Sequence, residues 1–315
     1  MQVNSGNIKY RLILKFLKHT IISGVIFILS SVILLGIAAY VFQERIEKLF
    51  VETINQNLET EVTIENINLN LIRHFPMASI TFTGVDARGS GQKTVPSQLL
   101  IAHRIHFKFS LWNLIIGNYT IREVRIENAS LSLKRFSDGT TNFHVWRTDT
   151  LSSNNQFEFN VKEVELHRVH FVYQDHLTHH LIDLAVNKTN LRGQFRLMNY
   201  LLEAKGTLNA NQIMLDSAVF VRNRPVEIDI LLNVLNNREF QFQKGQIRLN
   251  DNLFDVKGTI ASTLNGVLFD THVHGQKLHL GRLLNDLPEN FHKYIDGYRA
   301  KGILQADAKI VGLLN

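Results

Sequence analysis

The residues of this chain best suited to chemistry are histidines, which occur in two small groups. His176, His179 and His180 lie within five residues, and His272 and His274 stand two apart, as on one face of a strand. Imidazole binds transition metals and transfers protons near neutral pH, so each group is a candidate metal or acid–base site. No carboxylate stands at the spacing of an HExxH zinc site. We interpret the first group as a solvated loop between strands and the second as exposed strand residues.

Other catalytic patterns are missing from the sequence. Segment 89–94 (GSGQKT) resembles a phosphate loop but lacks the two glycines that let backbone N–H groups approach a phosphate, so we predict a hairpin loop. There is no GxSxG, GxGxxG or EF-hand pattern, and the acidic residues are dispersed. The absence of cysteine excludes disulfides, thiol nucleophiles and cysteine-ligated metals. We predict a protein that is not an enzyme and holds no metal or cofactor.

The positive charge is concentrated at the N-terminus. The chain has 315 residues and a formal net charge of +6, of which residues 1–19 carry four positive charges and no acid. The rest of the chain is therefore nearly neutral and has no basic stripe interleaved with aromatic residues. This distribution argues against a nucleic-acid partner and for a basic tail.

The basic tail leads into residues 20–42, which contain no charged side chain. As a helix, this segment would span roughly 34 Å, enough to cross the hydrocarbon core of a membrane. Basic residues before a span favour a cytoplasmic N-terminus, with the remainder across the membrane. A cleaved signal peptide, with a small-x-small pattern at 36–38, and a buried core helix are the alternatives. Residues 43–59 have apolar residues at helical spacing and predict an amphipathic linker helix, packed on the sheet or on the membrane surface.

The rest of the chain has the period of β-strands. In residues 104–111 (RIHFKFSL) apolar and polar side chains alternate, as they do in 78–82 and 226–230. The four prolines fall between such runs in this interpretation. Short helices are expected only at 111–116 and within 278–298, where Pro288 would divide the segment.

An internal repeat accompanies this alternation. Residues 124–133 and 164–173 share the apolar template V-x-[IL]-x-x-[AV]-x-[LF]-x-[LY], and residues 62–71 match the same spacing. The two-residue step in the middle shifts the phase of the alternation. A bulge or tight corner at that step would keep all the apolar side chains on one face.

A sheet with one apolar face and little helix to cover it must hide that face from water. It can pack on a second sheet as a sandwich, close into a barrel, or curl into a trough covered by lipid chains, and an exposed apolar surface of this size marks a binding site. Each apolar position could equally be ordinary sandwich core. The residues expected to contact acyl chains are Ile105, Phe107, Phe109, Ile126, Leu131, Leu133, Leu166, Phe171 and Tyr173.

Several short motifs follow the apolar span in a fixed order. In that order they resemble the N-terminal part of AsmA-family proteins of the diderm bacterial envelope, and the similarity runs from about residue 10 to the end of the chain. The motifs are INQNLETEV (54–62), FPMASI (75–80), FSLW (109–112), GNYTI (117–121), DGTTNF (138–143) and LPENF (287–291).

The resemblance implies a function that the patterns alone do not. AsmA-like proteins are anchored in the inner membrane and project into the periplasm. They are grouped with TamB-like and chorein-like bridge proteins, whose U-shaped apolar groove is thought to carry phospholipid acyl chains toward the outer membrane. The family has no catalytic residues to carry over. An envelope scaffold that binds another protein through an open sheet edge or the groove is the alternative.

The expected architecture follows from the resemblance. It comprises a cytoplasmic tail (1–19), a single transmembrane helix (20–42), a linker helix (43–59) and a curled antiparallel β-groove in the periplasm (60–315) with a few short helices. Because family members usually run longer, we expect the groove to be truncated at its C-terminus. The expected partners are phospholipid acyl chains, the inner membrane and outer-membrane assembly proteins.

Overall fold

The computed structural model describes residues 60–70, 77–90, 97–110, 119–145, 157–195, 197–216, 218–263, 266–285 and 300–314, with isolated residues 23, 26, 30, 31, 34, 58, 291, 294, 295 and 297. The predicted basic tail, most of the span and linker, and the helix at 111–116 lie outside this set. The described residues of the predicted span are helical. Within the described part of the chain, no helix is long and apolar enough to cross a membrane.

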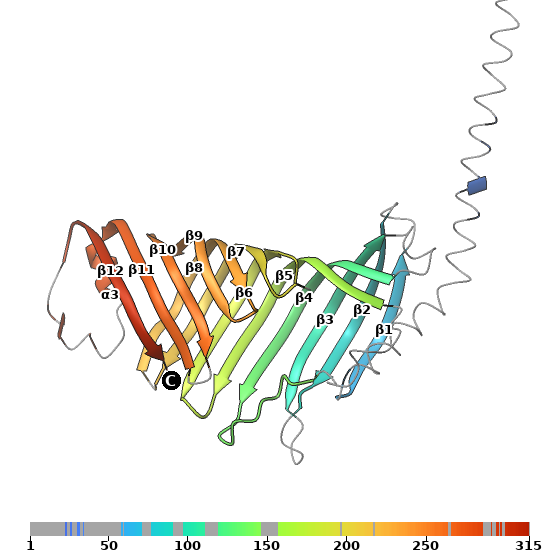
Figure 1. The fold of residues 1–315 in the computed structure, drawn as a ribbon, viewed down its shortest axis with the longest axis horizontal. Helices are drawn as coiled ribbons and strands as arrows, with labels where there is room; N and C mark the ends of the chain where they lie inside the picture. Colours follow the sequence, from blue (N-terminus) through green and yellow to red (C-terminus); the bar gives the residue numbers. More distant parts are fainter. Residues whose placement is uncertain are drawn as a thin grey trace, which may run out of the picture.

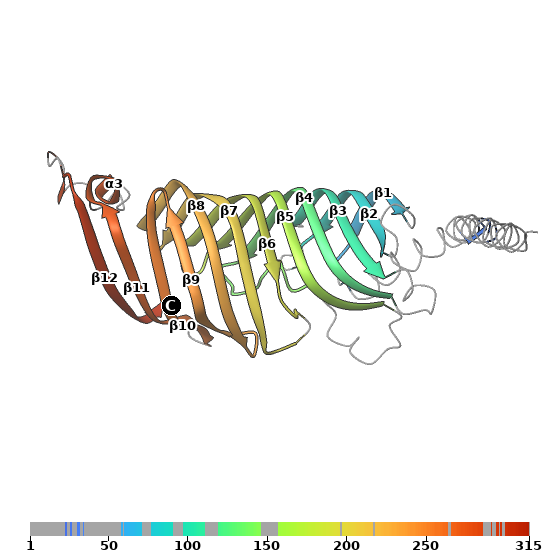
Figure 2. The ribbon, with the colours of Figure 1, turned by 90° about the horizontal axis from the view of Figure 1, so that it is seen from above.

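The described body is one open sheet of twelve strands that lie in chain order (Figure 1). The prediction of a mainly β protein is confirmed, and the described strands form neither a sandwich nor a closed barrel, because each of them pairs only with its sequence neighbours. Figure 2 shows the strands bent along their length, so that the sheet is curled. The strands are β1 (Val62–Asn70), β2 (Met77–Arg88), β3 (Gln98–Ser110), β4 (Tyr119–Arg135), β5 (Phe157–Asp175), β6 (His180–Arg192), β7 (Tyr200–Leu215), β8 (Ala218–Leu235), β9 (Glu239–Leu249), β10 (Asn252–Thr263), β11 (Gly266–His279) and β12 (Ile303–Leu314).

The sheet departs from the prediction at one seam, because β4 and β5 pair in parallel while every other neighbouring pair is antiparallel. A fully antiparallel groove is therefore wrong as a description. The chain leaves β4 at one end of the strand and enters β5 at the opposite end, which requires a long connection. In that connection Asn142 is fully buried: its Oδ1 accepts from the Lys134 N–H at 2.7 Å and its Nδ2 donates to the Ser132 carbonyl at 2.8 Å.

This seam aligns two copies of the repeat. Residues 124–133 of β4 and 164–173 of β5 pair residue for residue. At the phase shift, Asn128 (φ 51°) and Arg168 (φ 52°) adopt left-handed backbone, and the Arg168 Nε donates to Asn128 Oδ1 at 2.6 Å. One left-handed residue rotates the strand so that the apolar side chains before and after it share a face. The predicted corner is confirmed in both copies.

The sheet has two chemically different faces. We call the side that bears the apolar residues of the repeat the inner face and the other side the outer face. Charged side chains pair between strands on the outer face: Arg104 Nη1 lies 3.3 Å from Glu127 Oε2, Arg125 Nε lies 2.5 Å from Glu165 Oε2, and Lys108 pairs with Glu123. Each such pair contributes at most about 1 kcal/mol to the stability of the fold. Together the pairs give the outer face the charged character of a solvent-exposed surface.

Burial of the inner face is uneven along the sheet. Burial is greatest around β2 and β3, where Ile80 and Phe82 are each at most 2% exposed, and Ile121 at the start of β4 is equally buried. The rings of Phe82 and Phe107 meet edge to face with centroids 5.2 Å apart. From β5 onward most inner-face residues are half-buried.

Two smaller expectations change with the structure. A helix, α3 (Leu280–Asn285), forms where the first of two was expected, and the segment around Pro288 lies outside the described residues. Pro225 lies inside β8 rather than between strands. It is tolerated because β9 has already ended there: Leu249 pairs with Val226, so no N–H donor is required of residue 225 on that side, and its carbonyl accepts from the Asn250 N–H at 3.0 Å.

Candidate functional site

The candidate site is the inner face, which holds all nine residues expected to contact acyl chains. Cross-strand pairing places them in rows: Ile105, Ile126 and Leu166 form one row, and Leu133 lies beside Tyr173. They differ in accessibility. Ile105 and Phe109 are buried at 6% and 3% exposure, and Phe107 is packed on Phe82. The half-buried ones are Ile126, Leu131, Leu133, Leu166, Phe171 and Tyr173.

These rows continue across the rest of the sheet. Leu131 pairs with Phe171, Phe171 with Leu184, and Leu184 with Ala210. The last four strands carry the same apolar character at inner-face positions. Those residues include Phe242 and Ile247 on β9, Val256 and Ile260 on β10, Phe269 and Val273 on β11, and Ala308 and Ile310 on β12.

A glycine on β10 helps to fix the backbone of this open part. Gly258 has φ +108°, and a Cβ there would lie 2.1 Å from the Asp270 carbonyl oxygen of β11. Only glycine adopts this conformation without strain and permits that approach. The close contact between β10 and β11 therefore depends on this residue.

Charged groups interrupt the inner face at the ends of β4 and β5. Arg135 Nη1 lies 3.3 Å from Asp175 Oδ2, and Asp175 is only 4% exposed. Burial opposes ionisation of this carboxyl group, but hydrogen bonds from the Thr178 and Leu177 N–H groups outweigh it, and the pKa of Asp175 is lowered. The Tyr173 hydroxyl also donates to Asp175, at 3.3 Å. The pair neutralises itself, so it does not attract a ligand charge.

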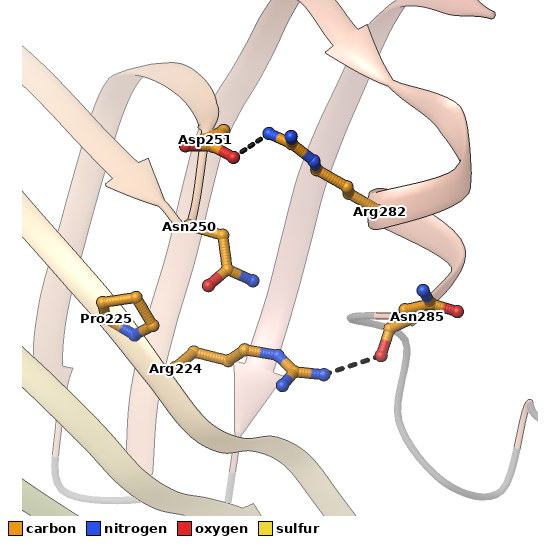
Figure 3. A pocket seen from close by; sticks show the side chains of 6 residues that line it. All are labelled: Arg224, Pro225, Asn250, Asp251, Arg282 and Asn285. Atoms are coloured by element: carbon orange, nitrogen blue, oxygen red, sulfur yellow. Dashed lines mark hydrogen bonds and ion pairs between the residues drawn. The ribbon is translucent and has the colours of Figure 1, made fainter. Parts of the chain in front are cut away.

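A second polar feature lies at the rim of the inner face. A pocket of about 470 Å³ is lined by Arg224, Pro225, Asn250, Asp251, Arg282 and Asn285 (Figure 3). Arg224 Nη2 donates to the Asn285 carbonyl at 2.7 Å, and Arg282 pairs with Asp251. These residues are not among the site residues predicted from the sequence. The detectable signal is that residues 219–228 have the spacing of the repeat at 124–133, with Arg224 at the position of Ala129.

The histidine groups lie apart from the apolar rows, although His180 pairs with Asp175 at the end of the inner face. His176 and His179 are exposed in the turn between β5 and β6, which confirms the predicted loop, and His180 Nδ1 lies 2.9 Å from the Thr178 hydroxyl. His272 and His274 lie on the outer face of β11, as predicted.

The contact of the second histidine group with β12 was not anticipated. His272 contacts Asp307, and His274 Nδ1 lies 3.0 Å from Asp307 Oδ2. Among the described residues, no three histidine, aspartate or glutamate side chains are arranged to hold a metal ion.

Comparison with known proteins does not assign the chain to a family. No family model, no curated protein and no solved structure matches it.

Proposed function

We propose that this protein is a membrane-anchored carrier that binds phospholipid acyl chains on the inner face of its curled sheet. The observation that carries the proposal is that one face of a single open sheet is mainly apolar from β1 to β12, while outside β2 and β3 most side chains of that face are only half-buried. An apolar surface of this extent is unfavourable in water unless it is covered.

Acyl chains suit such a surface physically. They are flexible, have no hydrogen-bonding groups, and gain about 0.8 kcal/mol for each methylene removed from water. The inner face offers long apolar rows and few donors or acceptors, which favours a ligand of this kind over a polar substrate. The bent strands give the face a curvature that a chain can follow (Figure 2).

The location of the carrier rests on the sequence. The uncharged segment 20–42 after a basic tail supports an inner-membrane anchor with the sheet in the periplasm. The ordered motifs that resemble AsmA-family proteins support phospholipid transport and outer-membrane assembly, with a U-shaped groove as the carrier surface. Under this proposal the protein needs no catalytic residue and no cofactor.

The proposal is tested by lipid retention in two matched variants. Phe171 faces inward between Leu131 and Leu184, whereas Val172 on the same strand faces outward opposite Asp183. The full chain is purified in mild detergent and examined by native mass spectrometry with lipid extraction. We expect phospholipid on the wild-type protein and on Val172→Lys, and a loss of most of it from Phe171→Lys, with all three proteins folded by circular dichroism.

The opposite results would reject the carrier. Wild-type protein that purifies without lipid as a stable monomer, or a folded Phe171→Lys variant that retains as much lipid as Val172→Lys, contradicts acyl-chain binding on the inner face.

A protein scaffold is the second candidate, and the exposed last strand favours it. The outer edge of β12 pairs with no described strand, and both faces of its C-terminal half are apolar. Ile310 is 51% exposed on the inner face, and Val311 is 62% exposed on the outer face. Such an edge can accept a strand from another protein. A stoichiometric protein partner that is lost from Val311→Lys, with no lipid on either protein, would support the scaffold over the carrier.

A further inference from the structure

The rim pocket begins with a cation at an inner-face position. Arg224 pairs with Ala210 of β7, in the row that contains Leu184 and Phe171. The next inner-face residue along β8 is Val226. Strand β9 ends at Leu249, opposite Val226, so Arg224 lies beside the β9–β10 turn, while on β8 the apolar inner-face positions continue through Val221.

A second cation reaches the same place from α3. The start of this helix is fixed from two sides: the His279 N–H donates to the side-chain oxygen of buried Asn252 at 2.9 Å, and the Leu280 N–H donates to the Gly302 carbonyl at 3.1 Å. From this position Arg282 extends toward Asp251 and the helix end presents its carbonyl to Arg224 (Figure 3). Residues far apart in the chain thus converge at one rim.

The charge of the pocket favours an anion. Its lining holds two guanidinium groups and one carboxylate, Asp251. Arg282 and Asp251 are 55% and 63% exposed, so their ion pair contributes little stability and can open at small cost. Each guanidinium carries five N–H donors in a planar fork, which suits the oxygens of a phosphate group.

The pocket also adjoins the apolar face directly. Pro225 and Asn250 line it, and the residues beside them, Val226 and Leu249, pair with each other on the inner face. A molecule with its phosphate between Arg224 and Arg282 would have its apolar part on that face. A soluble phosphate compound would not use this second surface.

We propose that this rim pocket binds the phosphodiester head group of a phospholipid while its acyl chains lie on the inner face. The inference rests on the proposed carrier function and adds a head-group specificity to it. It predicts that the protein distinguishes an anionic phospholipid from a neutral lipid with the same chains.

The test compares two lipids on the full chain in detergent. The probes are dioleoylphosphatidylglycerol and dioleoylglycerol, measured by competition in native mass spectrometry. We expect wild-type protein to prefer the phospholipid by roughly tenfold, the effect of one hydrogen bond to a charged group. Arg224→Gln and Arg282→Gln should each remove most of this preference and leave dioleoylglycerol binding intact.

Two further variants control for folding and surface charge. Asp251→Asn removes the competing carboxylate and should increase the preference for the phospholipid, an effect that unfolding cannot produce. Arg248→Gln removes an arginine on the outer face, where it contacts Glu227 at 3.3 Å, and should change nothing. Because Arg282 and Asp251 are exposed, their variants remain informative even where Arg224→Gln fails to fold.

The outcomes distinguish failure of the head-group site from failure of the carrier function. Equal binding of both lipids, or an unchanged preference in folded Arg282→Gln, overturns the head-group site and leaves the carrier standing. No binding of either lipid rejects the carrier and the site with it. Inorganic phosphate alone, measured by calorimetry, should bind far more weakly than the phospholipid; equally tight binding would identify a site for a free anion and overturn the inference.

Discussion

Strands β2 and β3 share a sequence pattern with the last four strands but differ from them in burial. In β2 and β3 most inner-face residues form a closed core, with Ile80 and Ala102 fully buried. In β9–β12 the equivalent positions are mostly half-buried, and Ile310 is half-exposed. Alternation decides which face a side chain lies on, while what covers that face decides whether the residue serves stability or binding.

The same difference in burial separates the predicted acyl-chain contacts into two groups. Ile105 and Phe109 belong to the closed core, so their substitution tests folding before it tests binding. Phe171 and Tyr173 lie where the core opens and are better probes of a ligand. A binding experiment built on the buried positions alone would not distinguish the two regions.

The largest expected difference in the free energy of unfolding is between alanine substitutions of two phenylalanines. Phe82 is 2% exposed on β2, and Phe269 is half-buried on β11. We expect Phe82→Ala to lower the free energy of unfolding by about 3–5 kcal/mol through loss of burial and a cavity. Phe269→Ala should cost about 1 kcal/mol, because only part of a phenylalanine's transfer energy is involved. Urea denaturation measures both, and equal losses would show that the last strands are also a closed core.

Two glycines allow the backbones of the two regions to be compared. Both Gly84 on β2 and Gly258 on β10 have positive φ, but a Cβ at 84 would meet the flexible end of Glu65, whereas one at 258 would meet a backbone carbonyl. We expect Gly258→Ala to destabilise by about 3 kcal/mol and Gly84→Ala by about 1 kcal/mol. Thermal unfolding gives the order, and the reverse order would contradict the tight β10–β11 contact.

The boundary between the regions can be weakened at Asp175. Replacing it with alanine leaves the Leu177 and Thr178 N–H groups without their acceptor and should cost about 2 kcal/mol, whereas the exposed control Asp138→Ala should cost much less.

The pH dependence at Asp175 follows from its lowered pKa. The stabilisation is complete above the pKa of an unfolded aspartate, about 3.9, and is lost as pH falls through the lower folded pKa. Acid unfolding should therefore show a step that Asp175→Ala lacks.

The smallest effect concerns His106 on the outer face of the first region. Burial lowers its pKa, which outweighs the opposing effect of Glu127, and Arg104 lowers the pKa further. The folded protein therefore resists protonation of this ring. Stability should be complete above pH 6.5 and decline as pH falls from 6.5 to the folded pKa. His106→Gln should flatten this part of the stability curve, and the exposed control His176→Gln should leave it unchanged.

Much of the fold could be predicted from the sequence because it depends on local patterns. The alternation gives the strands, and the phase shift at Asn128 and Arg168 gives the corners. The parallel seam could not be predicted, because period-two alternation is the same in parallel and antiparallel strands. The position of Pro225 depends on where the neighbouring strand ends, which its own segment does not encode.

The candidate site also contains features that could be predicted from the sequence and features that could not. The apolar rows follow from the repeat, and the phase shift before Arg224 is a signal that could have placed this cation on the inner face. Arg282 and Asp251 meet only because α3 returns across the rim, a contact set by three-dimensional packing. The amphiphilic character of the pocket is therefore a property of the fold.

The parallel seam has a consequence for how the chain folds. On either side of it, most neighbouring strands join through short connections, whose pairing has a low entropic cost and is fast; the β11–β12 connection, which contains α3, is the exception. Pairing of β4 with β5 must instead wait until the intervening segment has closed a long loop. We therefore expect β1–β4 and β5–β11 to form first as separate cooperative units, with pairing at the seam and addition of β12 as the slow steps. In native-state hydrogen exchange, the amides of β1–β4 and β5–β11 should accordingly fall into two groups of different opening free energy.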